Sequence, residues 1–146
     1  MKLKKFPQIV IDTCVLISAL LSRQGASFNL LKRFGTGEFE TNLSVPICLE
    51  YESIVKKTAT EKQLQLTEKD IEKLIEIIIQ GSNLWEIHFL TRPFLPDPND
   101  EFLLELAFHA NCDFIITHNI KDFKGVKEFF GIEVVTPKQF LQFLDT

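Results

Sequence analysis

The sequence contains little of what secreted or membrane proteins rely on. Its three cysteines, Cys14, Cys48 and Cys112, are odd in number and form no CxxC pair, so we expect them to be reduced. The longest uncharged stretch, residues 13–22, is too short to span a bilayer. The basic N-terminus is not followed by the small residues of a signal-peptide cleavage site. These absences predict a cytoplasmic protein with no membrane partner.

The chain also lacks an excess of positive charge. It carries 16 Lys and Arg against 20 Asp and Glu, a formal net charge of −4. A protein that binds nucleic acid through a broad basic surface is therefore not expected. An enzyme that acts on nucleic acid through bound cations is still compatible with this charge, because the ions supply local positive charge. The 14 Phe, beside one Trp and one Tyr, favour core packing over base stacking.

Strand-like and helix-like segments alternate along the chain without an internal repeat. The alternation predicts one α/β domain over residues 1–146, with a mainly parallel central sheet. A chain of this length buries roughly two thirds of its unfolded surface around one core. Strands are expected at residues 8–12, 38–43, 84–90, 113–117 and 132–135. Helices are expected to begin near Thr13, Ala26, Val45, Glu68, Pro98 and Pro137, with residues 58–66 as a connection.

The first predicted strand is a β-branched run that ends abruptly in the carboxylate of Asp12. A strand this apolar on both faces is typical of the centre of a covered parallel sheet. Open α/β sheets bind their ligands at the carboxyl ends of the strands, so Asp12 is a candidate for chemistry. Alternatively, its side chain only caps the helix that starts near Thr13.

Three further side chains are expected at the same edge of the sheet as Asp12. In a right-handed β-α-β unit, helix starts and strand ends share one edge. Glu50 lies in the second turn of a predicted helix, Asp100 lies in the first turn of another, and Asn119 follows a strand. We therefore expect the four residues to converge.

Helical phase separates acids that face the core from acids that face solvent. Glu50 falls beside the apolar stripe of its helix, whereas Glu52 points away from it. Asp100 shares a face with apolar residues of its helix. Glu101 and Glu105 lie on the opposite face, and we expect them at the solvated surface.

Simpler roles stay open for several of these acids. Asp97 stands before Pro98, which is a strong N-cap signal, and Asp100 complements the same helix terminus. Glu50 by itself is typical of a partly exposed helix carboxylate. Asp122 is most simply interpreted as a turn residue.

A cluster of three carboxylates requires a cation, because unpaired like charges a few ångströms apart would keep one of them protonated. Oxygen ligands without His or Cys select a hard ion, Mg²⁺ or Mn²⁺. Such ions activate water and neutralise the leaving oxygen, which points to hydrolysis of phosphodiester bonds. A phosphatase or receiver that phosphorylates Asp12 is less well matched, since Cys14 stands where such phosphatases need a second acid.

Five segments carry a family resemblance: IVIDTCV (9–15), LEYESIV (49–55), DPNDEFL (97–103), DFIIT (113–117) and VVTPKQFL (134–141). In this order and spacing they resemble the PIN-domain nucleases, most of all the VapC-like group described as toxin components of bacterial toxin–antitoxin systems. The resemblance covers nearly the whole chain. It implies a three-layer α/β/α, Rossmann-like PIN fold and a Mg²⁺- or Mn²⁺-dependent ribonuclease acting on single-stranded or structured RNA. It also implies an antitoxin partner and a homodimer.

The resemblance also implies roles for individual residues. Asp12, Glu50 and Asp100 would be the catalytic, metal-binding acids. Thr13 and Thr117 would support these acids by hydrogen bonds.

Two other residues at positions matched by the family, Asp97 and Asn119, bear on whether the site binds one metal ion or two. Asp97 matches a common acid of this group and would be a further metal ligand. Many PIN nucleases have an aspartate where this chain has Asn119, which offers a carbonyl oxygen but no charge. Two-metal catalysis is therefore less well supported than binding of one ion.

The basic residues Arg23, Lys121 and Lys124 are candidates for contacting RNA phosphates. Our leading hypothesis is thus a metal-dependent endoribonuclease. The alternative is a catalytically weak or inactive PIN-fold module that binds RNA or protein partners.

Overall fold

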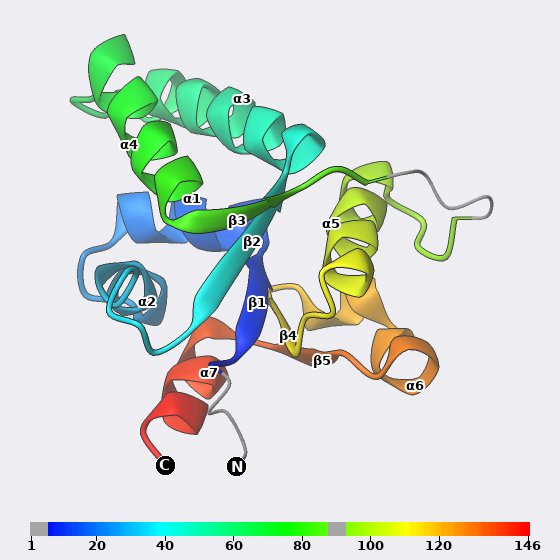
Figure 1. Ribbon diagram of the computed structural model, residues 1–146. Coiled ribbons are helices and arrows are strands. Elements are labelled where there is room, and N and C mark those ends of the chain that lie inside the picture. The colour runs from blue at the N-terminus through cyan, green and yellow to red at the C-terminus, as the bar shows by residue number, and fades with distance from the viewer. Residues whose placement is uncertain (1–5, 88–92) are drawn as a thin grey trace.

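The computed structural model describes residues 6–87 and 93–146. Its five described strands form one parallel sheet in the order β3-β2-β1-β4-β5 (Figure 1). This confirms the predicted α/β class with a parallel sheet. β1 occupies the centre, so Asp12 leaves the middle of the sheet. The strands are β1 (Gln8–Ile11), β2 (Glu40–Ser44), β3 (Ser82–Trp85), β4 (Phe114–Ile116) and β5 (Glu133–Val135).

Six helices begin at the predicted residues, and local caps or prolines mark the starts of four of them. Thr67 and Thr136 form capping boxes, and prolines stand in the first turns of α3, α5 and α7, where the missing N–H is not needed. The helices are α1 (Thr13–Leu21), α2 (Ala26–Lys32), α3 (Val45–Glu61), α4 (Glu68–Gln80), α5 (Pro98–His109), α6 (Val126–Phe130) and α7 (Pro137–Leu144), with a 3₁₀ turn η1 (Ile120–Phe123).

The structure differs from the sequence prediction in three short segments. α6 and η1 were not predicted, because five and four residues are too few to show a helical period. α3 continues to Glu61, so part of the connection expected at 58–66 is helical. β3 begins at Ser82, before the strand expected at 84–90, and residues 88–90 of that prediction lie outside the described residues.

Side chains of β1 alternate between two apolar cores, one on each face of the sheet. Ile9 and Ile11 pack in a core with Leu30 of α2 and Phe140 of α7. Val10 faces the other core, which holds residues of α3, α4 and α5. Helices on both faces explain why the three buried residues of β1, Ile9, Val10 and Ile11, are all apolar.

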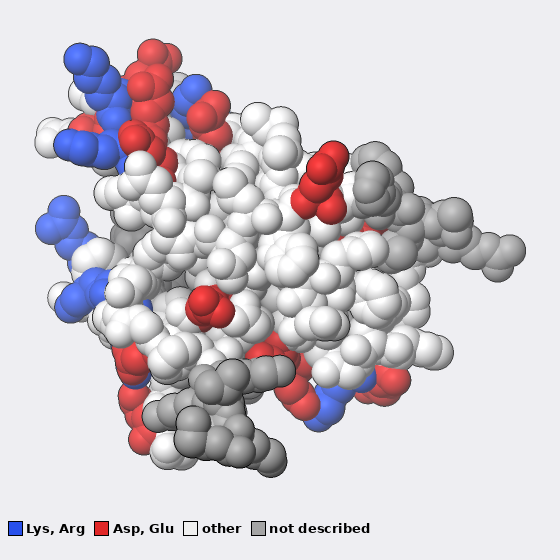
Figure 2. All heavy atoms as spheres, in the orientation of Figure 1, with Lys and Arg blue, Asp and Glu red and all other residues white. Residues whose placement is uncertain are grey.

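Charge is distributed unevenly over the surface. In Figure 2, charged side chains crowd the outer ends of α3 and α4, whereas the centre of the same face is almost free of charge. On α4 the charged side chains lie opposite the buried Ile71 and Ile75. The apolar stripe of α4 packs on the core, as is typical of an amphipathic helix.

Within residues 6–87 and 93–146, no single helix is long and apolar enough to cross a membrane. α1 and α2 satisfy the length and composition criteria only as a pair bent by 100°. Both helices contribute buried side chains to the core, including Leu16 and Leu30.

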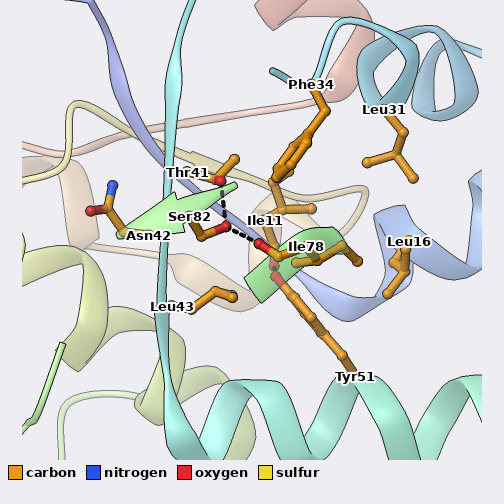
Figure 3. A pocket seen from close by; sticks show the side chains of 10 residues that line it. All are labelled: Ile11, Leu16, Leu31, Phe34, Thr41, Asn42, Leu43, Tyr51, Ile78 and Ser82. Atoms are coloured by element: carbon orange, nitrogen blue, oxygen red, sulfur yellow. Dashed lines mark hydrogen bonds between the residues drawn. The ribbon is translucent and has the colours of Figure 1, made fainter. Parts of the chain in front are cut away.

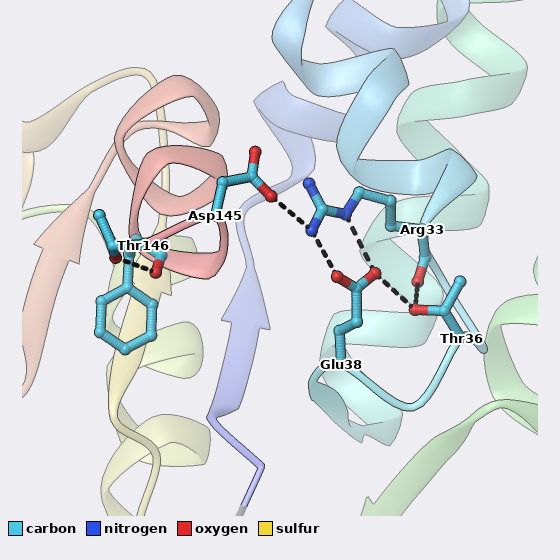
Figure 4. Close-up of polar contacts among 6 residues, drawn as sticks. Arg33, Thr36, Glu38, Asp145 and Thr146 are labelled. Atoms are coloured by element: carbon cyan, nitrogen blue, oxygen red, sulfur yellow. Dashed lines mark hydrogen bonds and ion pairs between the residues drawn. The ribbon is translucent and has the colours of Figure 1, made fainter.

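Arg33, at the end of α2, connects two parts of the chain that are far apart in sequence. Its guanidinium binds the carboxylate of Glu38 and, at 2.9 Å, that of Asp145 at the end of α7 (Figure 4). Hydrogen bonds to Glu38 and Asp145 raise the pKa of Arg33, and Arg33 in turn lowers the pKa of Glu38. All three side chains are partly exposed, so screening by solvent keeps their contribution to stability small.

Tyr51 of α3 joins that helix to the end of the central strand. It is 4% exposed, and its hydroxyl donates a hydrogen bond to the carbonyl oxygen of Ile11 (Figure 3). Its ring lines a small, mostly apolar cavity beside which Thr41 and Ser82 share a hydrogen bond of 2.6 Å. Tyr51 thereby holds the last residue of β1, immediately before Asp12.

We expect Tyr51→Phe to lower the free energy of unfolding by about 1–2 kcal/mol, because it removes the donor from a buried carbonyl. Urea denaturation followed by circular dichroism measures the change. Ser53→Ala, at an exposed position of the same helix, is the matched control and should leave stability nearly unchanged. Equal stability of Tyr51→Phe and wild type would show that this hydrogen bond does not contribute.

Candidate functional site

Asp12 lies at the carboxyl end of β1, where its backbone N–H donates to the carbonyl of Ile116 at 2.9 Å. It occupies the N-cap position of α1, yet its side chain makes no capping hydrogen bond to the described backbone. Asp12 Oδ2 instead accepts hydrogen bonds from Thr117 Oγ1 at 2.7 Å and from Cys14 Sγ at 3.4 Å. Burial and the charge of Asp12 raise the pKa of Cys14 to about 11, so this thiol is a neutral donor. Helix capping therefore does not explain the Asp12 carboxylate.

Glu50 projects from the second turn of α3 and is half-buried. Its Oε2 accepts a hydrogen bond of 2.5 Å from Thr13 Oγ1. Burial raises the pKa of Glu50, the bond from Thr13 opposes this rise, and the charges of Asp12 and Asp97 add to it. Glu50 is therefore within electrostatic reach of the other acids.

Among the three acids, Asp100, in the first turn of α5, has the most strongly raised pKa. Partial burial, followed by the negative charges of Asp12, Asp97, Asp122 and Glu50, raises its pKa to about 7. This shift means that five carboxyl groups share one electrostatic neighbourhood at the edge of the sheet. The structure thus brings the three acids predicted from sequence into mutual range.

Asp97 is the N-cap of α5, as its position before a proline predicts. Its Oδ1 accepts a hydrogen bond of 2.8 Å from the backbone N–H of Asn99. Asp97 nevertheless contributes to the raised pKa values of Glu50 and Asp100. Its capping role is thus compatible with membership of the acidic cluster.

Asn119 is tied to Asp12 through a buried hydroxyl. The backbone N–H of Asn119 donates to Thr117 Oγ1 at 3.0 Å, and Thr117, which is fully buried, donates to Asp12. The side chain of Asn119 is exposed beside η1. Its role as a metal ligand stays a prediction.

Glu101 and Glu105 are buried, 6% and 5% exposed, so the prediction that they lie at the solvated surface is wrong. Glu101 Oε1 accepts hydrogen bonds from the backbone N–H groups of Phe94 at 2.8 Å and Leu95 at 2.7 Å. Among the described residues, Glu101 Oε2 has no hydrogen-bond partner. Helical phase missed the burial of Glu101 because the loop before α5 packs against this residue, and the loop has no periodic pattern. Glu101 therefore fastens this loop beside Asp100.

A cleft opens next to Asp100, between the loop before α5 and η1. Lys121 and Lys124, which were predicted to contact RNA, are among its lining residues, whereas Arg23 lies at an exposed position outside this lining. The sequence did not indicate that the two lysines and Asp122 share this cleft. The lining consists of Phe94, Leu95, Pro96, Asp97, Asp100, Lys121, Asp122 and Lys124.

The chemistry of these side chains fits a hard divalent cation, since their ligand atoms are carboxylate oxygens. Burial, followed by the negative charges of neighbouring carboxylates, raises the pKa of Asp100, and a bound cation would relieve the repulsion between these charges. In the part of the chain that the structure describes, no three His, Cys, Asp or Glu side chains lie close enough together to hold an ion as they stand. Binding therefore requires the carboxylates to turn toward one another.

Comparisons with known proteins agree with the fold. A family model described as "PIN domain" matches residues 8–121. The structure of VapBC-1 from nontypeable Haemophilus influenzae is similar with a TM-score of 0.59 and 16% identity, covering 90% of this chain and 98% of that one. VapBC2 from Rickettsia felis, bound to a DNA fragment from its promoter, gives a TM-score of 0.56 and 13% identity, with 87% and 96% covered. At these identities the likeness concerns the fold. A comparison with curated proteins finds no match.

Proposed function

The chain belongs to the PIN domain family, whose model covers residues 8–121, and from this premise we propose that it is a metal-dependent endoribonuclease. Members of the family are generally nucleases. The observation that carries the proposal is the position of three acids at the carboxyl edge of the sheet: Asp12 follows β1, Glu50 and Asp100 lie near the starts of α3 and α5, and their charges act on one another. RNA as the substrate and Mg²⁺ or Mn²⁺ as the cofactor are parts of this proposal.

In the proposed site, Asp12, Glu50 and Asp100 hold the divalent ion, with Asp97 and Asn119 as further candidate ligands. When bound, such an ion lowers the pKa of a water and offsets charge on the leaving oxygen.

Neighbouring side chains orient the acids and the substrate in this proposal. Thr13 and Thr117 donate hydrogen bonds to Glu50 and Asp12, each to one carboxylate oxygen, so that these carboxylates can turn about the bonded oxygen when an ion binds. Lys121 and Lys124, at the rim of the adjoining cleft, attract phosphate groups of the RNA.

A cleavage assay tests the proposed activity. The purified full chain is incubated with end-labelled RNA in Mg²⁺ or Mn²⁺, and in parallel with EDTA. We expect fragments only when the divalent ion is present. Intact RNA in both ions, or equal cleavage in EDTA, would refute the proposal.

A non-catalytic binding module is the second candidate function. It is favoured by Asn119, which provides no negative charge at a position where many PIN nucleases have an acid, and by the open arrangement of the carboxylates. Metal binding separates the two functions, because the enzyme needs the ion and the module does not.

We expect Glu50→Gln to raise the Kd for Mn²⁺ by about tenfold or more, which corresponds to ~1.4 kcal/mol, because one charged ligand is lost. Isothermal titration calorimetry measures the constant. Glu52→Gln is the matched control, since Glu52 pairs with Lys56 at 3.3 Å on the same helix. Absence of Mn²⁺ binding by the wild type at millimolar concentration would instead favour the binding module.

We further propose that the chain is the toxin of a toxin–antitoxin pair and acts in the cytoplasm. In this proposal the chain is a single domain and forms a homodimer. The fold shared with the two VapBC structures supports an antitoxin partner. A small gene beside this one, encoding a DNA-binding protein, would be the candidate antitoxin. Expression of the chain alone should arrest growth, and co-expression with that gene should restore it. Normal growth without the second gene would count against the toxin role.

A further inference from the structure

We propose that the cleft between the loop before α5 and η1 binds an unpaired guanine of the RNA, adjacent to the phosphate that is cut. The inference rests on the proposed nuclease function and names part of its substrate. Asp100 belongs both to the acidic cluster and to the lining of the cleft. A nucleotide whose phosphate lies at the acids therefore has its base within reach of the cleft.

One wall of the cleft is apolar and consists of residues 94–96. Contacts with the rest of the protein fix its position. Glu101 binds the backbone N–H groups of Phe94 and Leu95, and the Leu95 side chain is buried. The Phe94 ring packs against the rings of Phe129 and Phe130, with centroids 5.4 and 5.1 Å away. A preformed wall loses little entropy when a flat, partly apolar base packs against it.

The position of Gly125 adds to this preorganisation. Gly125 adopts φ +88°, a conformation that favours glycine, and an added Cβ would lie 3.1 Å from Phe94 Cζ. Glycine thus lets the ring of Phe94 approach the backbone that follows η1. The loop before α5 and the segment that follows η1 therefore contact each other through Phe94 and Gly125, which fixes the two walls of the cleft relative to each other.

The polar groups of the cleft are of two kinds, carboxylates that accept hydrogen bonds and ammonium groups that donate them. Asp97 Oδ1 already caps α5, and Asp100 belongs to the proposed metal site. Asp122, at an exposed position of η1, is therefore the carboxylate available to a base. Lys121 and Lys124 flank it in the lining.

Guanine matches this pairing of a carboxylate with an ammonium group. Its N1–H and N2 amino groups are adjacent donors that suit a carboxylate, and its O6 and N7 are acceptors that suit a lysine. Adenine and cytosine each place a ring-nitrogen acceptor beside their single amino group, and that acceptor would face the carboxylate. Uracil flanks its N–H with two carbonyl oxygens. Because base pairing occupies the Watson–Crick edge of guanine, the cleft selects single-stranded or looped RNA.

Fluorescence anisotropy with short RNA probes tests the proposal. The probes are labelled uridine hexamers with G, A, C, U or inosine at one central position, titrated with the Asp12→Asn protein in Mg²⁺, and a gel checks that they stay intact. We expect the G probe to bind about tenfold more tightly than the A, C and U probes. Inosine, which lacks the N2 amino group, should fall between them.

Asp122→Asn, added to this protein, should remove the preference for guanine, because an amide no longer offers two acceptors. Glu72→Gln, at an exposed position on α4, is the matched control and should keep it. Equal affinity for all probes, or a preference that survives Asp122→Asn, would overturn the proposal.

Cleavage of a random-sequence RNA pool by the wild type provides the second readout. We expect guanine at one fixed position beside the cut, and its loss in Asp122→Asn. Cleavage without a preferred base would overturn the guanine proposal and leave the nuclease function standing. A complete lack of cleavage would count against the nuclease function, and the anisotropy result would then decide the role of the cleft.

Discussion

Replacing Asp12 with Asn is expected to lower the rate of metal-dependent RNA cleavage by about 100-fold or more, the scale on which loss of one charge-stabilising group acts. Asp12 leaves the central strand of the sheet, and its negative charge acts on Asp100 and Glu50. The substitution removes the charge while keeping nearly the same shape. Initial rates of cleavage of a labelled RNA, measured at saturating Mn²⁺, give the size of the loss.

The Asp12→Asn protein should remain folded, so that lost activity reports on chemistry. α1 does not depend on the Asp12 side chain for a cap to the described backbone, and an amide oxygen still accepts the hydrogen bond from Thr117. We expect the midpoint of thermal unfolding to stay at or above that of the wild type, because the substitution also removes a charge that acts on Asp100. Glu52→Gln is the matched control and should retain full activity. Undiminished cleavage by Asp12→Asn would rule out the proposed mechanism.

Replacing Asp100 with Asn should make the metal-free protein more stable at pH 8. The pKa of Asp100 is about 7 in the folded protein, whereas an aspartate in an unfolded chain has a pKa of about 3.9. Between these values the folded state binds more protons than the unfolded state, so the free energy of unfolding falls as pH rises from about 4 to about 7. The penalty is fully present above pH 7.

Asp100→Asn removes this penalty, and we expect a gain of about 1–2 kcal/mol at pH 8 after allowing for solvent screening. At pH 4 the variant and the wild type should be nearly equal in stability. Urea denaturation in EDTA across this pH range measures the difference. Glu128→Gln, at an exposed position on α6, is the control and should follow the pH profile of the wild type. A destabilised Asp100→Asn at pH 8 would contradict the clustering of charge.

A divalent ion should reverse the order of the two proteins. Ligands that bind only the folded state stabilise it in proportion to the logarithm of their concentration over Kd. Mn²⁺ should therefore stabilise the wild type more than Asp100→Asn. The acidic cluster is thus expected to lower the free energy of unfolding of the metal-free protein. Binding of the ion should raise this free energy again.

Features with a local signal could be predicted from the amino-acid sequence. The apolar run before Asp12 predicted the central strand, and the N-cap signal of Asp97 before Pro98 placed the start of α5. Glu50 and Asp100 could also be identified from sequence. Helical phase showed which acids face the apolar side of their helices, and strand ends and helix starts share one edge of the sheet in β-α-β units. The three acids do lie within electrostatic range of one another.

The packing of the aperiodic loops around these acids could not be predicted from the sequence and became apparent in the folded structure. The loop before α5 buries Glu101 by giving it two backbone N–H partners, although helical phase placed this residue at the surface. The same loop meets Lys121 and Asp122 of η1 in one cleft, although more than twenty residues separate the two segments in the sequence. Helix caps and periodic burial depend on residues within one or two helical turns of each other in the sequence. Contacts between irregular segments depend on the whole packed core, so no local pattern of residues reveals them.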